Sequence, residues 1–159
     1  MKPEAGAPVH IHGTAVLLGE SGVFIRGASG SGKSTLALAL VEAWRLRGDF
    51  ARLVGDDRIS ARIAGGRALV SPHRAIEGLA EWRGLGLIAQ DFEECAVLGL
   101  VVELETRQEN AARPRLPEPE QLRGEFMGLP ELALLRLPAR ETSRSVATIM
   151  AFLHKVWPK

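Results

Sequence analysis

The chain has 159 residues, of which 46% are hydrophobic and 25% charged, and its formal net charge is +1. This length predicts one domain, and the near-zero charge argues against a nucleic-acid-binding protein held by bulk charge. Cys95 is the only cysteine, which excludes an intrachain disulfide and a multi-cysteine metal site. The sequence contains no run of 18 apolar residues, so it predicts no membrane-spanning helix. Its first eight residues lack the apolar core of a secretory signal. We therefore expect a cytoplasmic protein that binds neither nucleic acid nor membrane.

Hydrophobic patterning predicts strands and helices that alternate along the chain. The first half predicts strands at 9–18, 23–26 and 51–55, a helix at 33–47, and a hairpin whose strands 59–64 and 67–71 flank Gly65-Gly66. The second half predicts a buried central strand at 96–104, a proline-containing loop at 106–120, a strand at 132–137 and a helix at 143–157. This order of elements predicts an α/β fold with a mixed central sheet.

Residues 27–34, GASGSGKS, match the pattern G-x-x-x-x-G-K-[ST] in full, between a predicted strand and a predicted helix. Glycines let backbone amides turn toward phosphate oxygens, and the helix N-terminus adds partial positive charge. Lys33 can neutralise the terminal phosphates and Ser34 can ligate Mg²⁺. The alternatives are a glycine-rich turn without a ligand, or phosphate binding for a switch or motor rather than a kinase. The predicted nucleotide-binding residues are Gly27, Ala28, Ser29, Gly30, Ser31, Gly32, Lys33, Ser34 and Thr35.

Two adjacent carboxylates, Asp56 and Asp57, follow the predicted strand 51–55. A parallel sheet brings strand ends to the phosphate loop, so one carboxylate can hold Mg²⁺ while the other accepts a proton. Adjacent residues of a strand point to opposite faces, which predicts that the two divide these roles. The alternative is a turn that simply begins with aspartate.

Two further groups of residues have weaker signals. In the segment 81–88, an extended backbone would place Glu81 and Arg83 on one side, as a metal ligand beside a phosphate clamp or as a surface ion pair. His12 lies fifteen residues before the phosphate loop and is a candidate catalytic residue, with His10 as its rival. His73 and His154 have no supporting context, and the four histidines with one cysteine predict no zinc site.

Together, these motifs resemble the catalytic domain of the HPr kinase/phosphorylase family. The resemblance is carried by HGTAVLLGESGVFIRGASGSGKS at 12–34, LVGDDRI at 53–59 and EWRGLGLI at 81–88. It implies a P-loop-containing mixed central sheet flanked by helices, related to phosphoenolpyruvate carboxykinases. It also implies ATP and Mg²⁺ as cofactors, an HPr-like phosphocarrier protein as substrate, and a homo-oligomer.

The resemblance implies a role for each matching residue. His12, Lys33 and Asp56 match active-site residues, and Asp56 matches the base that deprotonates a serine of the substrate protein. Ser34 and Glu81 match Mg²⁺ ligands, and Asp57 matches a second acidic residue close to the metal. Arg83 lies in a segment that the family needs for both of its activities, and Arg115 is the best match for a distal catalytic arginine. Either Arg140 or Arg144 matches an arginine tied to dephosphorylation.

The chain also departs from the family pattern. It begins almost at the catalytic domain, so it resembles the short form found in some proteobacteria. The match is poorest around Arg115 and at 138–144, so we expect kinase activity to exceed the phosphate-dependent reverse activity. Two other functions stay open, namely a P-loop module that senses nucleotide without turnover and a small-molecule kinase. The carboxylates beside the phosphate loop favour an enzyme over a sensor.

Overall fold

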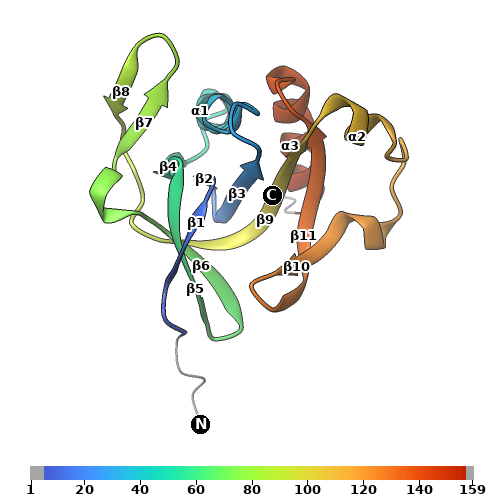
Figure 1. Ribbon diagram of the computed structural model, residues 1–159, viewed down its shortest axis with the longest axis horizontal. Coiled ribbons are helices and arrows are strands. Elements are labelled where there is room, and N and C mark those ends of the chain that lie inside the picture. The colour runs from blue at the N-terminus through green and yellow to red at the C-terminus, as the bar shows by residue number, and fades with distance from the viewer. Residues whose placement is uncertain (1–5, 157–159) are drawn as a thin grey trace.

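A computed structural model describes residues 6–156, and its elements follow one another as Figure 1 shows. The helices are α1 (Lys33–Leu46), α2 (Arg107–Ala111) and α3 (Thr142–Val156), with short 3-10 turns η1 (Arg74–Ile76) and η2 (Pro119–Leu122). The strands are β1 (Val9–His12), β2 (Thr14–Leu18), β3 (Ser21–Gly27), β4 (Ala51–Gly55), β5 (Arg58–Ala64), β6 (Arg67–Pro72), β7 (Leu79–Trp82), β8 (Gly86–Ala89), β9 (Ala96–Glu105), β10 (Arg123–Phe126) and β11 (Leu129–Pro138).

Strand β9 organises the main sheet, whose order is β1-β5-β6-β9-β3-β2-β4. It pairs with β6 antiparallel at its start, with β3 parallel along its length and with β11 parallel at its end; β10 then pairs with β11. Because β3, β9 and β11 run parallel, their C-terminal ends meet at one edge of the sheet. The predicted mixed α/β sheet, its central strand at 96–104 and the hairpin around Gly65-Gly66 are confirmed.

Each face of the sheet buries its own hydrophobic core, because successive residues of a strand point to opposite faces. Helices α1 and α3 cover one face, where Leu40 and Ile149 are fully buried against the strands. Ile149 and Leu153 of α3 thus lie in this core, and Val146 packs against it. On the other face, Phe24 of β3 meets Phe126 of β10 edge to face, with ring centroids 5.7 Å apart.

The predicted strand 9–18 is divided in two at Gly13. This glycine has φ +154°, and a Cβ there would lie 2.3 Å from the Phe24 ring, so only glycine fits. Strand β2 pairs with β3 and β4, whereas β1, beyond the bend, pairs with β5. The halves differ in character, since β1 is VHIH and mostly exposed while β2 is TAVLL and mostly buried.

The prediction of a loop over 106–120 is wrong in part. Helix α2 begins with a capping box, in which the Thr106 hydroxyl accepts from the Glu109 amide and the Glu109 carboxylate accepts from Thr106. Hydrogen bonds from the Thr106 amide and hydroxyl to the Glu109 carboxylate lower the pKa of Glu109. Residues 112–118 form no helix or strand. Strands β7, β8 and β10 are absent from the predicted elements, and Trp157, the predicted end of the last helix, lies outside the described residues.

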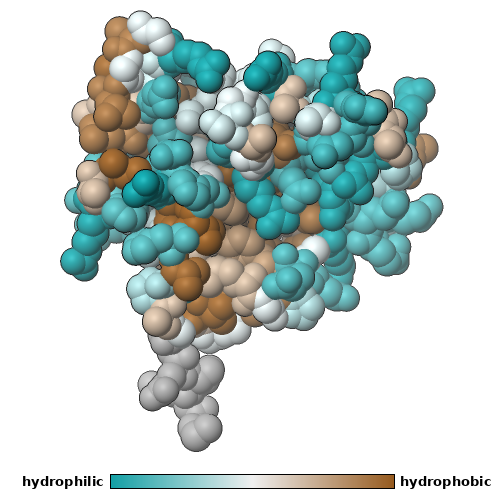
Figure 2. Space-filling view, viewed as in Figure 1, coloured by the Kyte–Doolittle hydropathy of each residue, from teal (hydrophilic) through white to brown (hydrophobic). Residues whose placement is uncertain are grey.

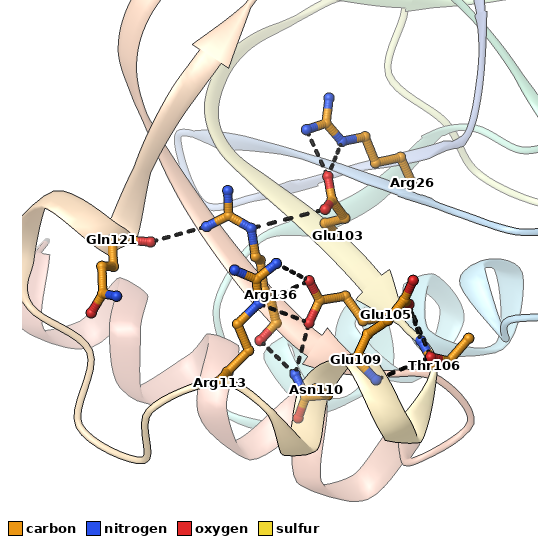
Figure 3. Close-up of polar contacts among 9 residues, drawn as sticks. All are labelled: Arg26, Glu103, Glu105, Thr106, Glu109, Asn110, Arg113, Gln121 and Arg136. Atoms are coloured by element: carbon orange, nitrogen blue, oxygen red, sulfur yellow. Dashed lines mark hydrogen bonds and ion pairs between the residues drawn. The ribbon is translucent and has the colours of Figure 1, made fainter.

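A charged network joins the ends of the three parallel strands (Figure 3). Glu103 of β9 is in register with Arg26 of β3 and Arg136 of β11, and it bonds to both guanidinium groups at N···O distances of 2.7 and 3.9 Å. Two residues further on, the buried Glu105 carboxylate accepts from Arg113 and Asn110, which ties α2 to β9. The hydrogen bond to Glu105 raises the pKa of Arg113.

We predict that Glu105→Gln lowers the free energy of unfolding by about 1–3 kcal/mol, since it removes the charge from buried hydrogen bonds. The measurement is the urea midpoint of each variant. Glu94→Gln is the control, because Glu94 is exposed and no hydrogen bond to it is seen in the described part of the chain. Equal midpoints for the two variants would contradict the prediction.

Candidate functional site

The phosphate-binding motif forms the connection between β3 and α1. Strand β3 ends at Gly27 and α1 begins at Lys33, so residues 28–32 turn around the helix N-terminus. Gly30 and Gly32 have φ values of +75° and +93°, which favour glycine. The Lys33 ammonium donates to the carbonyl oxygens of Gly27 and Ala28, each at 3.0 Å. The motif therefore has the strand–loop–helix setting that phosphate binding requires.

A cavity of about 650 Å³ opens above this loop. That volume is within the usual range for a small-molecule site. The cavity lies at the C-terminal edge of the parallel strands β3 and β11, where α/β sheets bind their ligands. Its lining residues are His12, Thr14, Gly27, Ser29, Gly30, Gly32, Lys33, Ser34, Thr35, Asp57, Glu81, Arg83, Arg140 and Thr142.

Asp56 is a buried carboxylate beside the cavity, with 4% of the residue exposed. Its Oδ1 accepts from the hydroxyls of Thr14 at 2.8 Å and Ser34 at 2.6 Å, and its Oδ2 accepts from the Glu81 amide at 2.9 Å. The cavity lining does not include Asp56. Asp56 thus joins β2, α1 and β7, and both of its oxygens are engaged.

Asp57 has quite different surroundings. It is exposed, lines the cavity and has φ +64°, and its carbonyl accepts from the Gly13 amide at 3.0 Å. Because β4 already ends at Gly55, the left-handed backbone of Asp57, rather than strand alternation, turns the two carboxylates apart. A carboxylate open to the cavity can accept a proton or bind a cation there.

The hairpin β7–β8 supplies Glu81 and Arg83 to the cavity. Both residues line it, although Arg83 lies in the turn and not in an extended segment. The same hairpin carries the exposed leucines Leu85 and Leu87, in the region that is brown at the upper left of Figure 2, and Trp82 is exposed as well. In Figure 1 the hairpin and α3 stand on opposite sides of α1, so the cavity lining comes from well-separated parts of the chain.

The structure distinguishes between the histidines. His12, exposed at the end of β1, lines the cavity. The other candidate, His10, does not line the cavity. The centroid of the His10 ring lies 4.8 Å from that of the His73 ring. His154 contacts the Arg47 guanidinium at the far end of α1.

Arginine positions are where sequence reasoning and structure differ most. Arg115, the expected distal catalytic arginine, is exposed in the segment 112–118 and does not line the cavity. Arg140 lines the cavity, because it lies two residues after the end of β11 at the parallel edge. Its amide donates to the Ser31 carbonyl at 3.1 Å, its Nε donates to the Gly30 carbonyl at 2.9 Å, and its φ is +63°. The partial family match at 138–144 points to Arg140, whereas neither Thr14 nor Thr142 is among the site residues predicted from the sequence.

The donors in the cavity fit Mg²⁺. Ser34, Asp57 and Glu81 all offer oxygen, and Mg²⁺ is usually held by one or two carboxylates together with substrate phosphates. Among residues 6–156, no cluster of three or more His, Cys, Asp or Glu could hold a metal by itself. The arrangement therefore suits an ion shared with a phosphate ligand.

Comparisons with known proteins agree with this geometry. Residues 5–155 match the family model of the HPr Serine kinase C-terminal domain. An HPr kinase/phosphorylase from Exiguobacterium sibiricum is 42% identical over 89 residues, which are 55% of this chain and 27% of the relative. Relatives of the same name from Clostridium tetani and Treponema pallidum are 29% identical over 147 residues and 34% over 117, covering 88% and 68% of this chain and 45% and 35% of their own lengths. The chain thus spans less than half the length of these curated relatives.

The structure of the Hpr(Ser) kinase/phosphatase from Coxiella burnetii superposes with a TM-score of 0.71, over 93% of this chain and 90% of that one, at 21% identity. This likeness supports the fold. In addition, no helix within the described residues is long and apolar enough to span a membrane. A single-domain short form of proteobacterial type stays a prediction, since the relatives come from several genera. The match of one family model to residues 5–155 shows that the chain belongs to the HPr serine kinase C-terminal domain family.

Proposed function

We propose that this chain is an ATP- and Mg²⁺-dependent kinase that phosphorylates a serine of an HPr-like phosphocarrier protein, and that it also catalyses the phosphate-dependent reverse reaction. One observation carries the proposal: the phosphate loop 27–35, apart from Ala28 and Ser31, lines the same cavity as the open carboxylate of Asp57 and three cationic side chains. The names of the curated relatives support it. The proposal places the protein in the cytoplasm as a homo-oligomer.

The phosphate loop binds and orients the nucleotide in this proposal. Backbone amides at the start of α1 and the Lys33 ammonium face the phosphate oxygens, while Arg140 closes the loop from the other side. Phosphoryl transfer depends mainly on positioning and electrostatic stabilisation, which these groups supply. Bound at Ser34 and Glu81, Mg²⁺ would neutralise charge on the phosphates.

In this proposal, Asp57 accepts the proton of the serine hydroxyl. A general base must be within hydrogen-bond reach of the hydroxyl it deprotonates, and Asp57 is open to the cavity. Asp56, expected to be the base from the family resemblance, already accepts three hydrogen bonds. We therefore assign the serine proton to Asp57 instead of Asp56. Asp56 then holds Ser34 and the hairpin in place. Arg83 adds positive charge beside the reacting phosphoryl group, and the His12 imidazole lines the same cavity.

The direct test is mass spectrometry of a purified HPr-like protein after incubation with this chain, ATP and Mg²⁺. We expect a mass increase of one phosphoryl group, located on a serine. Nucleotide binding without any phosphorylated serine would contradict the kinase and favour the sensor module.

We predict that Lys33→Ala lowers nucleotide affinity and reduces turnover by about 10²–10³-fold, because one cationic contact to the transferred group is lost. Calorimetry measures the affinity, and the rate of phosphoserine formation measures turnover. Lys155→Ala is the control, since Lys155 is exposed near the end of α3. Near-normal turnover of Lys33→Ala would show that the phosphate loop is not the catalytic site.

Parallel asparagine variants test the two aspartates. Asp57→Asn should keep nucleotide affinity and lose about 10²–10⁴-fold in turnover, because only proton acceptance is removed. Asp56→Asn should instead weaken Mg²⁺ binding and lower the unfolding midpoint, because an amide cannot accept all three hydrogen bonds. If Asp56→Asn loses turnover with Mg²⁺ affinity and stability intact, Asp56 is the base after all.

The reverse reaction needs inorganic phosphate held as the nucleophile, and an arginine suits that anion. We predict that Arg140→Ala slows pyrophosphate release from phosphoserine substrate and phosphate more than it slows the forward reaction. Arg115→Ala, changed at an arginine outside the cavity, should affect neither rate. The opposite order of the two variants would restore Arg115 as the catalytic arginine.

The same assay compares the forward and reverse rates of the wild-type protein. We expect the forward reaction to be faster.

A further inference from the structure

Thr14 is a fully buried polar residue at the first position of β2, immediately after the bend at Gly13. Its hydroxyl donates to Asp56 Oδ1 across 42 positions of the chain, at 2.8 Å. The same oxygen accepts from the Ser34 hydroxyl, and the other carboxylate oxygen accepts from the Glu81 amide. Thr14 therefore bonds to a carboxylate that contacts both proposed Mg²⁺ ligands.

The backbone beside Thr14 is held just as closely. The Gly13 amide donates to the Asp57 carbonyl at 3.0 Å, and Gly13 has no room for a side chain against Phe24 and Ile25. The segment 12–14 thus bonds to both aspartates, to one through a side chain and to the other through the backbone. His12, at the start of this segment, lines the cavity.

We propose that Thr14 is a positioning residue, which sets the orientation of the Asp56 carboxylate and, through it, of the Ser34 hydroxyl and the Glu81 segment. The terminal torsion of aspartate has a broad, roughly two-fold preference, so hydrogen-bond donors must select its plane. Donors from β2, α1 and β7 meet at Asp56 from three directions, and Thr14 is the donor that does not itself come from a proposed ligand residue. The part of this inference that concerns Mg²⁺ rests on the proposed function.

The test replaces the hydroxyl and keeps the shape. Thr14→Val fills the same volume without a donor, and Thr14→Ser restores the donor. Titration calorimetry measures the affinity for Mg²⁺ in the presence of a non-hydrolysable ATP analogue. A second titration measures the affinity for the analogue in the absence of Mg²⁺. Losing a group that orients metal ligands typically costs about 10–100-fold in metal affinity. We expect that loss in Thr14→Val, recovery in Thr14→Ser, and unchanged affinity for the analogue alone.

Thr148→Val is the matched control, because the Thr148 hydroxyl donates to the Arg144 carbonyl on α3, away from Asp56. Urea midpoints of all variants without ligand separate positioning from stability. Wild-type Mg²⁺ affinity in a folded Thr14→Val protein would overturn the proposal, as would a loss of stability with no loss of Mg²⁺ affinity. Should the valine variant not fold, Thr14→Ala against Thr14→Ser makes the same comparison.

Failure of this proposal can be distinguished from failure of the proposed function. If the wild type phosphorylates the HPr-like protein and Thr14→Val does so equally at every Mg²⁺ concentration, Thr14 has no positioning role. If no serine is phosphorylated but Thr14→Val still weakens Mg²⁺ binding, the kinase is wrong and the role of Thr14 stands.

Discussion

The Asp56 carboxylate is the point at which the separate parts of the site meet. A buried carboxylate is tolerated only where hydrogen bonds replace its hydration, and here the hydroxyls of Thr14 and Ser34 and the Glu81 amide do so. The dependence is mutual, because each donor would lack a partner without the carboxylate. One buried charge thus sets the position of β2 relative to the phosphate loop and of the hairpin β7–β8 relative to both.

Parallel strand pairing brings the remaining groups to the same edge. The phosphate loop follows β3, and Arg140 and α3 follow β11, with β9 between them. Glu103 holds the three strand ends in register through Arg26 and Arg136, just before the loops that carry the site. The network of Figure 3 is therefore part of the scaffold that supports the site, although no member of it lines the cavity.

Sequence reasoning succeeds here where the signal is local. The spacing of glycines in 27–34 and the pair Gly65-Gly66 determine the phosphate loop and one hairpin without reference to the rest of the chain. The capping box at Thr106 is equally local but lies beside three prolines, which favoured a loop. By contrast, whether Arg115 or Arg140 reaches the cavity depends on the pairing of β11 with β9, and the surroundings of Asp56 depend on Thr14, which is 42 residues away. The local sequence therefore offers candidate arginines without deciding between them, and it gives no sign of the contact between Thr14 and Asp56.

The cavity is lined by residues from His12 to Thr142, almost the whole described chain. Such contacts close long loops, which makes them late and cooperative events in folding. A ligand that binds the site therefore contacts segments from both ends of the described chain and acts on the folding equilibrium of the domain. At a free ligand concentration of 100 times the dissociation constant, that linkage adds about 2.7 kcal/mol to the unfolding free energy. A ligand bound in the cavity would in this way raise the resistance of the whole domain to unfolding and proteolysis.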